Sequence, residues 1–230
     1  MDETSLLVRA AWVCPIDQPR LRDGWVHVDH DRITAVGQGA HAPEAGREID
    51  LGSAVVLPGL VNAHTHLELS WLRGAVPPEP EFLIWVGQLM RARGSFERAD
   101  EGAKMAAVRT GIAEMRACGT VAVGDIANAL VTPAMLDEMA MPAVVFHELM
   151  GFCDADGHAA VAAARERRAS LGSAQVRVVP APHAPFSVSP ELFIAIRDDV
   201  QAAARPLTSV HVGESAAEVQ FLRDGGGPWR

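Results

Sequence analysis

The sequence predicts an α/β protein in which a small β-rich domain precedes a larger domain built on a parallel sheet. Residues 1–54 hold short apolar segments punctuated by Pro and Gly, and no segment there has the apolar period and length of a helix. From residue 55 onward, apolar strand segments alternate with helical ones, which is typical of a parallel sheet covered by helices. We therefore expect one domain over residues 1–54 and a second over residues 55–230.

About five β-then-α units are expected in the second domain. Pro190 suits the first turn of a helix, and Ser215 with Glu218 three residues later forms a capping-box pattern at the start of another. The expected strands are 54–60, 120–126, 143–150, 176–181 and 207–212. The expected helices are 82–118 with a break near 94–95, 133–140, 158–171, 190–204 and 215–222.

Five such units fit two architectures, an open doubly wound sheet and part of a (β/α)8 barrel. No Gly-x-Gly-x-x-Gly follows the first expected strand, so the nucleotide-binding version of the open sheet has no support. Both architectures place chemistry at the C-terminal ends of the strands.

Composition limits the partners and the compartment. The net charge of −9 argues against a nucleic-acid or anionic-membrane partner, because either needs a basic face. No apolar run approaches the roughly 18 residues that span a bilayer, and the acidic start lacks the basic region of a signal peptide. Cys14, Cys118 and Cys153 are widely spaced, so we expect neither a disulfide framework nor a thiolate cluster, and a cytoplasmic location.

Acids and histidines follow every expected strand of the second domain. His64 and His66 are two residues apart, so on a strand they point to the same side and can hold one ion. His211 would supply the third imidazole of a catalytic zinc site, and Glu214 would act as a general acid/base. The alternatives are histidines in turns or in the core, and a Glu214 that only caps the following helix.

Three segments resemble the amidohydrolase superfamily. Residues 56–66, Val-Leu-Pro-Gly-Leu-Val-Asn-Ala-His-Thr-His, resemble its strand-one signature. Residues 182–187 and 211–214 resemble motifs of its deaminase and chlorohydrolase branch. The resemblance covers the whole chain, and it implies the N-terminal part of a (β/α)8 TIM barrel preceded by a small β-sandwich-type domain.

The resemblance also implies a mechanism. His64, His66 and His211 would bind one divalent metal ion, Zn²⁺ or alternatively Fe²⁺, and Glu214 would shuttle the proton. The metal would lower the pKa of its water to about 7, and the hydroxide would add to a ring carbon from which ammonia leaves. Binuclear members need a Lys on the fourth strand, but Lys104, the only Lys, lies on an expected helix.

Further residues are candidates for contact with the substrate. The run from His64 to Ser70, with Phe82 and Trp85, resembles aminodeoxyfutalosine deaminases. The superfamily resemblance implies that His183 contacts a small N-heterocyclic substrate, and this second resemblance adds Glu68 and Trp85. The alternatives are a surface acid for Glu68 and a core aromatic for Trp85. Asp125 and Glu148 could line the pocket, but helix capping or loop hydrogen bonding is expected for each. Structural or surface positions are expected for His27, His30, His41, His147 and His158.

Three functions stay open: deamination of an aminated purine-type nucleoside or related N-heterocycle, hydrolysis of another C–N or C–Cl bond, and a noncatalytic metal-binding fragment. The family pattern requires a further His on strand six and an Asp on strand eight, which lie beyond the five units present. A five-unit piece exposes sheet edges and apolar faces. We therefore expect the isolated chain to be poorly soluble or partly molten and catalytically silent, and a full-length protein to form a homodimer.

Overall fold

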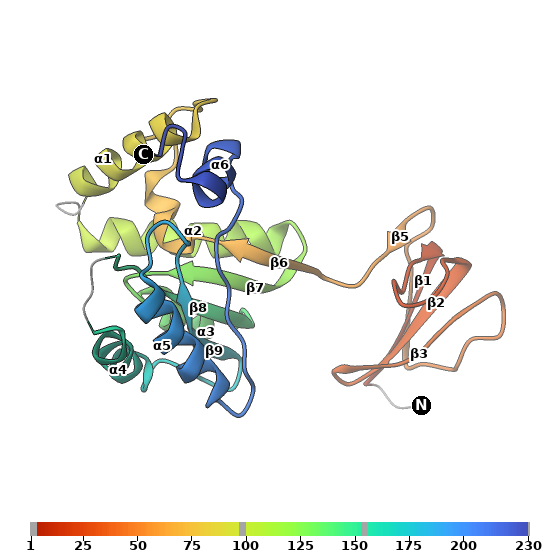
Figure 1. Cartoon of the computed structure of the whole chain (residues 1–230). Coiled ribbons are helices and arrows are strands. Elements are labelled where there is room, and N and C mark those ends of the chain that lie inside the picture. Colours follow the sequence, from red (N-terminus) through yellow and green to blue (C-terminus); the bar gives the residue numbers. More distant parts are fainter. Residues whose placement is uncertain (1–3, 97–99, 153–155, 230) are drawn as a thin grey trace. The chain divides into compact units, whose positions relative to one another are not determined.

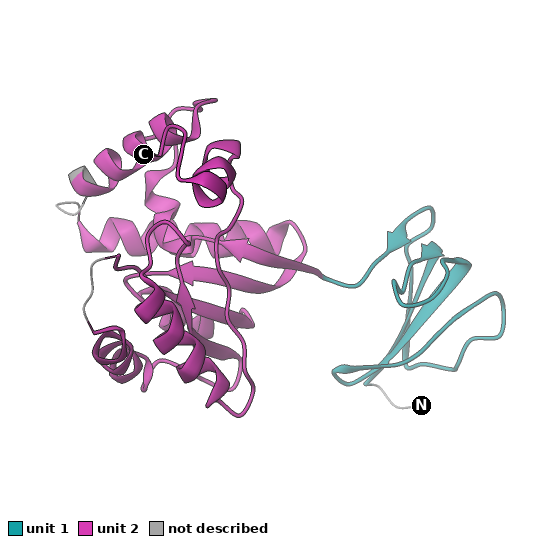
Figure 2. Cartoon of the chain, viewed as in Figure 1, with its two compact units in different colours: residues 1–59 teal, residues 60–230 magenta. Residues whose placement is uncertain are grey.

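The computed structural model describes residues 4–96, 100–152 and 156–229 (Figure 1). The chain divides into two compact units, residues 1–59 and residues 60–230 (Figure 2). The sequence placed this boundary after residue 54, but Val55–Val56 (β5) pairs in parallel with the end of Ser5–Val13 (β1). The strand expected over residues 54–60 is therefore divided, with β5 in the first sheet and a new strand from Leu60 in the second.

The first unit is built on a five-stranded sheet in the order β3-β2-β1-β4, with β5 also paired to β1. Gly37 is needed here, because a Cβ at this position would lie 2.3 Å from the Trp25 indole. The described residues of this unit form one sheet, whereas the sandwich that the resemblance implies has two. The strands are β1, β2 (Leu21–Asp29), β3 (Arg32–Gln38), β4 (Arg47–Asp50) and β5.

The second unit contains a four-stranded parallel sheet in the order β6-β7-β8-β9. Helices connect these strands, as Figure 1 shows, and this arrangement confirms the predicted α/β class with a parallel sheet. The elements are β6 (Leu60–Thr65), η1 (Leu67–Leu72), α1 (Phe82–Phe96), α2 (Glu101–Ala117), β7 (Thr120–Ala127), α3 (Thr132–Glu138), β8 (Ala143–Leu149), α4 (Gly157–Arg168), β9 (Val176–Pro182), α5 (Pro190–Gln201) and α6 (Ala216–Asp224).

The two faces of this sheet have different neighbours. On one face, Val123 and Val145 pack in a buried cluster with Ile112 of α2 and Leu136 of α3. Burying each such side chain stabilises the fold by about 1.5–3 kcal/mol. The other face carries a separate buried cluster of Ile126, Phe146, Val179 and Ala181. Among the described residues, no helix is both long and apolar enough to cross a membrane.

The fifth expected strand, residues 207–212, does not form a strand in the structure. This segment runs beside β9, where Thr208 Oγ1 donates to the Pro180 carbonyl (2.8 Å) and the His211 N–H donates to the His183 carbonyl (2.8 Å). The Pro180 carbonyl faces this segment, so backbone N–H groups at positions 180 and 182 would face it as well, because residues two apart on a strand point to the same side. Both positions are proline, which has no N–H to donate. A β9 edge without these donors cannot complete a ladder, so the expectation of five strands was wrong.

Candidate metal centre and active site

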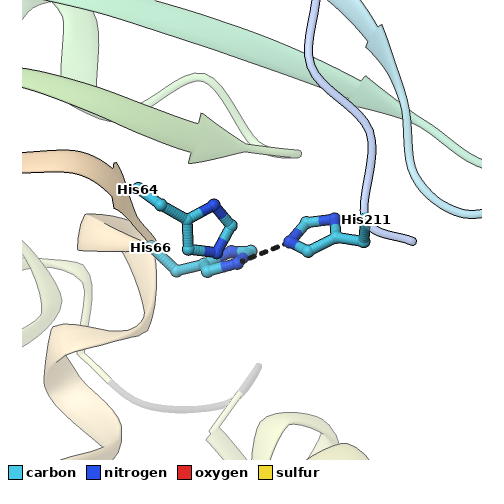
Figure 3. A group of neighbouring side chains, drawn as sticks. All are labelled: His64, His66 and His211. Atoms are coloured by element: carbon cyan, nitrogen blue, oxygen red, sulfur yellow. Dashed lines mark hydrogen bonds between the residues drawn. The ribbon is translucent and has the colours of Figure 1, made fainter. Parts of the chain in front are cut away.

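Three histidine side chains converge at the C-terminal end of the sheet (Figure 3). His64 lies on β6, His66 follows it at the start of η1, and His211 comes from the segment beside β9. The ring centroids lie 5.1 Å apart for His64 and His66, 4.9 Å for His64 and His211, and 5.3 Å for His66 and His211. One nitrogen from each ring lies within 4.8 Å of the other two, so the structure brings together the predicted ligands.

The arrangement of the ring nitrogens fits a divalent cation. His66 Nε2 and His211 Nε2 lie 3.3 Å apart, and ligands about 2.0–2.1 Å from a tetrahedral zinc are about 3.4 Å apart. His211 Nδ1 lies 3.1 Å from Glu148 Oε1, so its proton belongs on Nδ1 and its Nε2 lone pair faces His66. Burial lowers the pKa of His66 to about 4, so that ring is neutral at neutral pH. A cation between these nitrogens would use both lone pairs.

Glu148 is the carboxylate that orients His211. It ends β8 with its side chain buried, and Asn128 Nδ2 donates to its Oε2 (2.9 Å). The Glu148 carboxylate in turn raises the pKa of His211. The expectation that Glu148 caps a helix or bonds a loop is therefore incomplete, because it missed the contact with His211. Strand alternation could have found it, since Glu148 shares the face of Phe146 two residues earlier.

His183 is also a neighbour of His211. It follows β9, its ring centroid is 5.3 Å from that of His211, and its Nδ1 lies 2.5 Å from Ser187 Oγ. Burial lowers the pKa of His183. Glu148, His183 and His211 form a second set of ligand atoms within 4.8 Å of one another, and this set shares His211 with the first.

Glu214 is exposed on the loop between His211 and α6. The loop is fixed by Glu218, whose fully buried carboxylate accepts the N–H groups of Gly213 (3.0 Å) and Glu214 (2.8 Å). Ser215 Oγ caps α6 by accepting the Glu218 N–H (3.1 Å), so the side-chain cap of this helix is Ser215 rather than Glu214. Glu218, expected only as the acid of a capping box, instead positions the backbone of Glu214.

Glu68 and Trp85 lie in different surroundings. Glu68 is buried, and its two carboxylate oxygens accept the N–H groups of Asn128 and Ala129, each at 2.9 Å. Its interpretation as a surface acid is therefore wrong, and its contact with substrate stays a prediction.

Trp85 is half-buried on α1 and belongs to a series of aromatic rings. Its ring lies 6.1 Å from that of Phe82, and Phe82 lies 6.4 Å from Trp229. The Trp229 ring lies 4.1 Å from Phe186, which meets His183 edge-on at 5.8 Å. The series reaches the candidate metal centre through His183, so an aromatic ligand near that histidine would find flat apolar neighbours.

Asp125, at the end of β7, is a loop-bonding residue as the sequence predicted. Its side chain is fully buried, with Oδ1 accepting the Leu67 N–H (2.8 Å) and Oδ2 accepting the Thr132 hydroxyl (2.6 Å). These bonds fix the chain directly after His66. Burial raises the pKa of Asp125 to about 7, although both hydrogen bonds lower it.

This raised pKa predicts a pH dependence of stability. Between pH 4 and 7 the unfolded chain loses the Asp125 proton before the folded chain does, so stability falls as pH rises. In Asp125→Asn the amide oxygen can accept the Leu67 N–H while the amide nitrogen donates to Thr132 Oγ1. We expect this variant to gain up to about 4 kcal/mol over the wild type at pH 8 and little at pH 4. Thermal unfolding from pH 4 to 8 measures this, with Asp31→Asn as the exposed control; equal slopes for wild type and Asp125→Asn would contradict it.

Comparison with known proteins identifies the family of the chain. The model of the amidohydrolase family matches residues 55–228. The chain belongs to the amidohydrolase family. The chain is 27% identical over 234 residues to the 5-methylthioadenosine/S-adenosylhomocysteine deaminase of Moorella thermoacetica, covering 95% of this chain and 51% of that protein.

Two solved amidohydrolase-like structures are also similar. One is the Helicobacter pylori aminofutalosine deaminase in complex with methylthio-coformycin, with a TM-score of 0.81 and 25% identity, covering 97% of this chain and 54% of that one. The other is an adenosine deaminase from Xanthomonas campestris with bound zinc, with a TM-score of 0.73 and 26% identity, covering 97% and 53%. The chain thus spans about half the length of these relatives.

Proposed function

We propose that this amidohydrolase is a metal-dependent deaminase that acts on an aminated purine-type nucleoside or a related N-heterocycle. The observation that carries the proposal is the 3.3 Å approach of two ring nitrogens, His66 Nε2 and His211 Nε2, with His64 beside them. The relatives support the reaction class, because their names describe deaminases of nucleosides, and one of their structures contains zinc.

His64, His66 and His211 would hold the ion, and imidazole nitrogens suit Zn²⁺. The bound ion would supply Lewis-acid activation of water near neutral pH. The Glu148 carboxylate, with Oε1 3.1 Å from His211 Nδ1, would favour the proton on Nδ1 and so leave Nε2 available for the ion.

The remaining groups would act on the substrate. Glu214, on the loop fixed by Glu218, would accept a proton from the attacking water and return it to the leaving nitrogen. His183 would contact the heterocycle where negative charge develops, and Trp85 with its neighbouring rings would pack against the flat base. We keep Glu68 as a candidate contact for a polar group of the nucleoside.

The test begins with metal stoichiometry. The purified chain is stripped of metal, titrated with Zn²⁺ against a chelating dye, and then mixed with methylthio-coformycin, the ligand of the H. pylori relative. We expect one Zn²⁺ per chain and tighter binding of the nucleoside analogue when zinc is present. Ammonia release from a nucleoside panel is measured for the chain and for the complete product of its gene. Failure to bind zinc, or ammonia release from none of the nucleosides by either protein, would overturn the proposal.

A further inference from the structure

We infer that Asn128 is a positioning residue for the metal centre, because it fixes the carboxylate that orients His211. Asn128 directly follows β7 and is half-buried. Nothing in the sequence pattern distinguishes it, since it is a lone amide in a loop. The inference rests on the proposed metal site. Its test distinguishes a failure of the role of Asn128 from a failure of the proposed function.

Asn128 joins four elements that are distant in the sequence. Its backbone N–H donates to Glu68 Oε1 of η1 (2.9 Å), and its carbonyl accepts from Arg167 of α4 (3.4 Å). Its side-chain Oδ1 accepts from both terminal nitrogens of Arg93 on α1 (3.3 and 3.4 Å). Its Nδ2 donates to the Glu148 carbonyl (3.2 Å) and to Glu148 Oε2 (2.9 Å) on β8.

The chemistry of these partners fixes the orientation of the amide. The oxygen faces a guanidinium, which only donates, and the nitrogen faces a carboxylate, which only accepts. The opposite orientation would place two acceptors together and two donors together. Arg93 also lies 3.7 Å from Glu68 Oε1, so the same group of charges holds the backbone and the side chain of Asn128.

The link to the metal centre runs through the two oxygens of Glu148. Asn128 holds Oε2, and this leaves Oε1 directed at His211 Nδ1, 3.1 Å away. Partners that orient a metal-binding histidine in this way contribute about 10–100-fold in metal affinity. Without the Asn128 amide, the Glu148 carboxylate can rotate, and the His211 ring loses its fixed orientation.

The variants follow from this geometry. Asn128→Asp keeps an acceptor for Arg93 but places a carboxylate against Glu148, whereas Asn128→Ala removes both contacts. We expect Zn²⁺ affinity to fall about 10-fold in Asn128→Ala and further in Asn128→Asp. The visible absorption spectrum of the Co²⁺-loaded chain should change in both, because it reports ligand geometry. Arg167→Ala removes a contact to the Asn128 backbone carbonyl and leaves the partners of the Asn128 side chain in place, so it should leave both readouts unchanged.

A double-mutant cycle tests whether Asn128 acts on the metal centre through Glu148. If Asn128 acts through Glu148, then Asn128→Ala made in a Glu148→Ala background should cause no further loss of Zn²⁺ affinity. Circular dichroism of the metal-free chain checks folding; if Asn128→Asp does not fold, the alanine cycle carries the test. Additive losses in the cycle, or a lowered melting temperature with unchanged Zn²⁺ affinity and Co²⁺ spectrum, would overturn the inference. A wild-type chain that binds no Zn²⁺ would instead overturn the proposed function.

Discussion

Replacing His211 with Ala should abolish stoichiometric zinc binding by this chain. His211 contributes the nitrogen 3.3 Å from His66 Nε2, and its removal leaves two imidazoles and takes the ion-pair partner from Oε1 of the buried Glu148 carboxylate. Loss of a group that merely orients a ligand costs about 10–100-fold in affinity, so loss of the ligand itself should exceed 100-fold. Competition with a chelating dye measures the change.

The matched control for this variant is His158→Ala. His158 is exposed on α4 and contributes to neither set of candidate ligand atoms. This variant should bind Zn²⁺ with wild-type affinity. If His211→Ala kept that affinity as well, the histidine cluster would not be the metal centre, whatever the activity of the protein.

Replacing Glu214 with Gln should separate metal binding from turnover. The exposed carboxylate of Glu214 lies on a loop whose backbone is held by Glu218, and a Gln there leaves those backbone hydrogen bonds intact. We expect unchanged zinc affinity and a fall in kcat of about 10²–10⁴-fold, the usual contribution of a positioned general acid/base. Ammonia release by the complete gene product with its best nucleoside measures this effect.

Glu191→Gln is the control for this second substitution. Glu191 is also exposed and lies in the first turn of a helix, α5, so its replacement changes a similar helix-terminal charge outside the candidate site. Its kcat should stay at the wild-type value. A Glu214→Gln enzyme that turned over within a few-fold of wild type would exclude Glu214 as the proton shuttle.

Local sequence patterns predicted most of the second unit. The β-then-α alternation identified β7, β8 and β9, and Ser215 and Pro190 correctly located the starts of α6 and α5. The prediction of a fifth strand was wrong, and the residues of that segment alone do not show why. Residues 207–212 have a strand-like apolar pattern, but the neighbour against which they would pair carries Pro180 and Pro182.

In the candidate site, too, some residues were predicted from the sequence and others were not. His64, His66 and His211 were predicted from their places at strand ends, and the structure brings them together. Asn128, Glu148 and Glu218 were not predicted as site residues, because their roles come from long-range pairings and loop geometry. The Asn128–Glu68 contact joins residues 60 positions apart, and no short motif encodes it. Sequence motifs therefore identified groups that would touch the ion, but not those that hold them in place.

The prolines of β9 also affect how the site holds together over time. The segment carrying His211 is joined to β9 through the hydrogen bonds of Thr208 and His211, so its local opening needs less free energy than the opening of the paired strands. An ion held by His211, His64 and His66 would connect this segment to β6 at the opposite edge of the sheet. Ordering the backbone of residues 207–212 would then offset part of the free energy of ion binding. A change that raises metal affinity should therefore also raise the protection of the amides of this segment from hydrogen exchange, and the reverse.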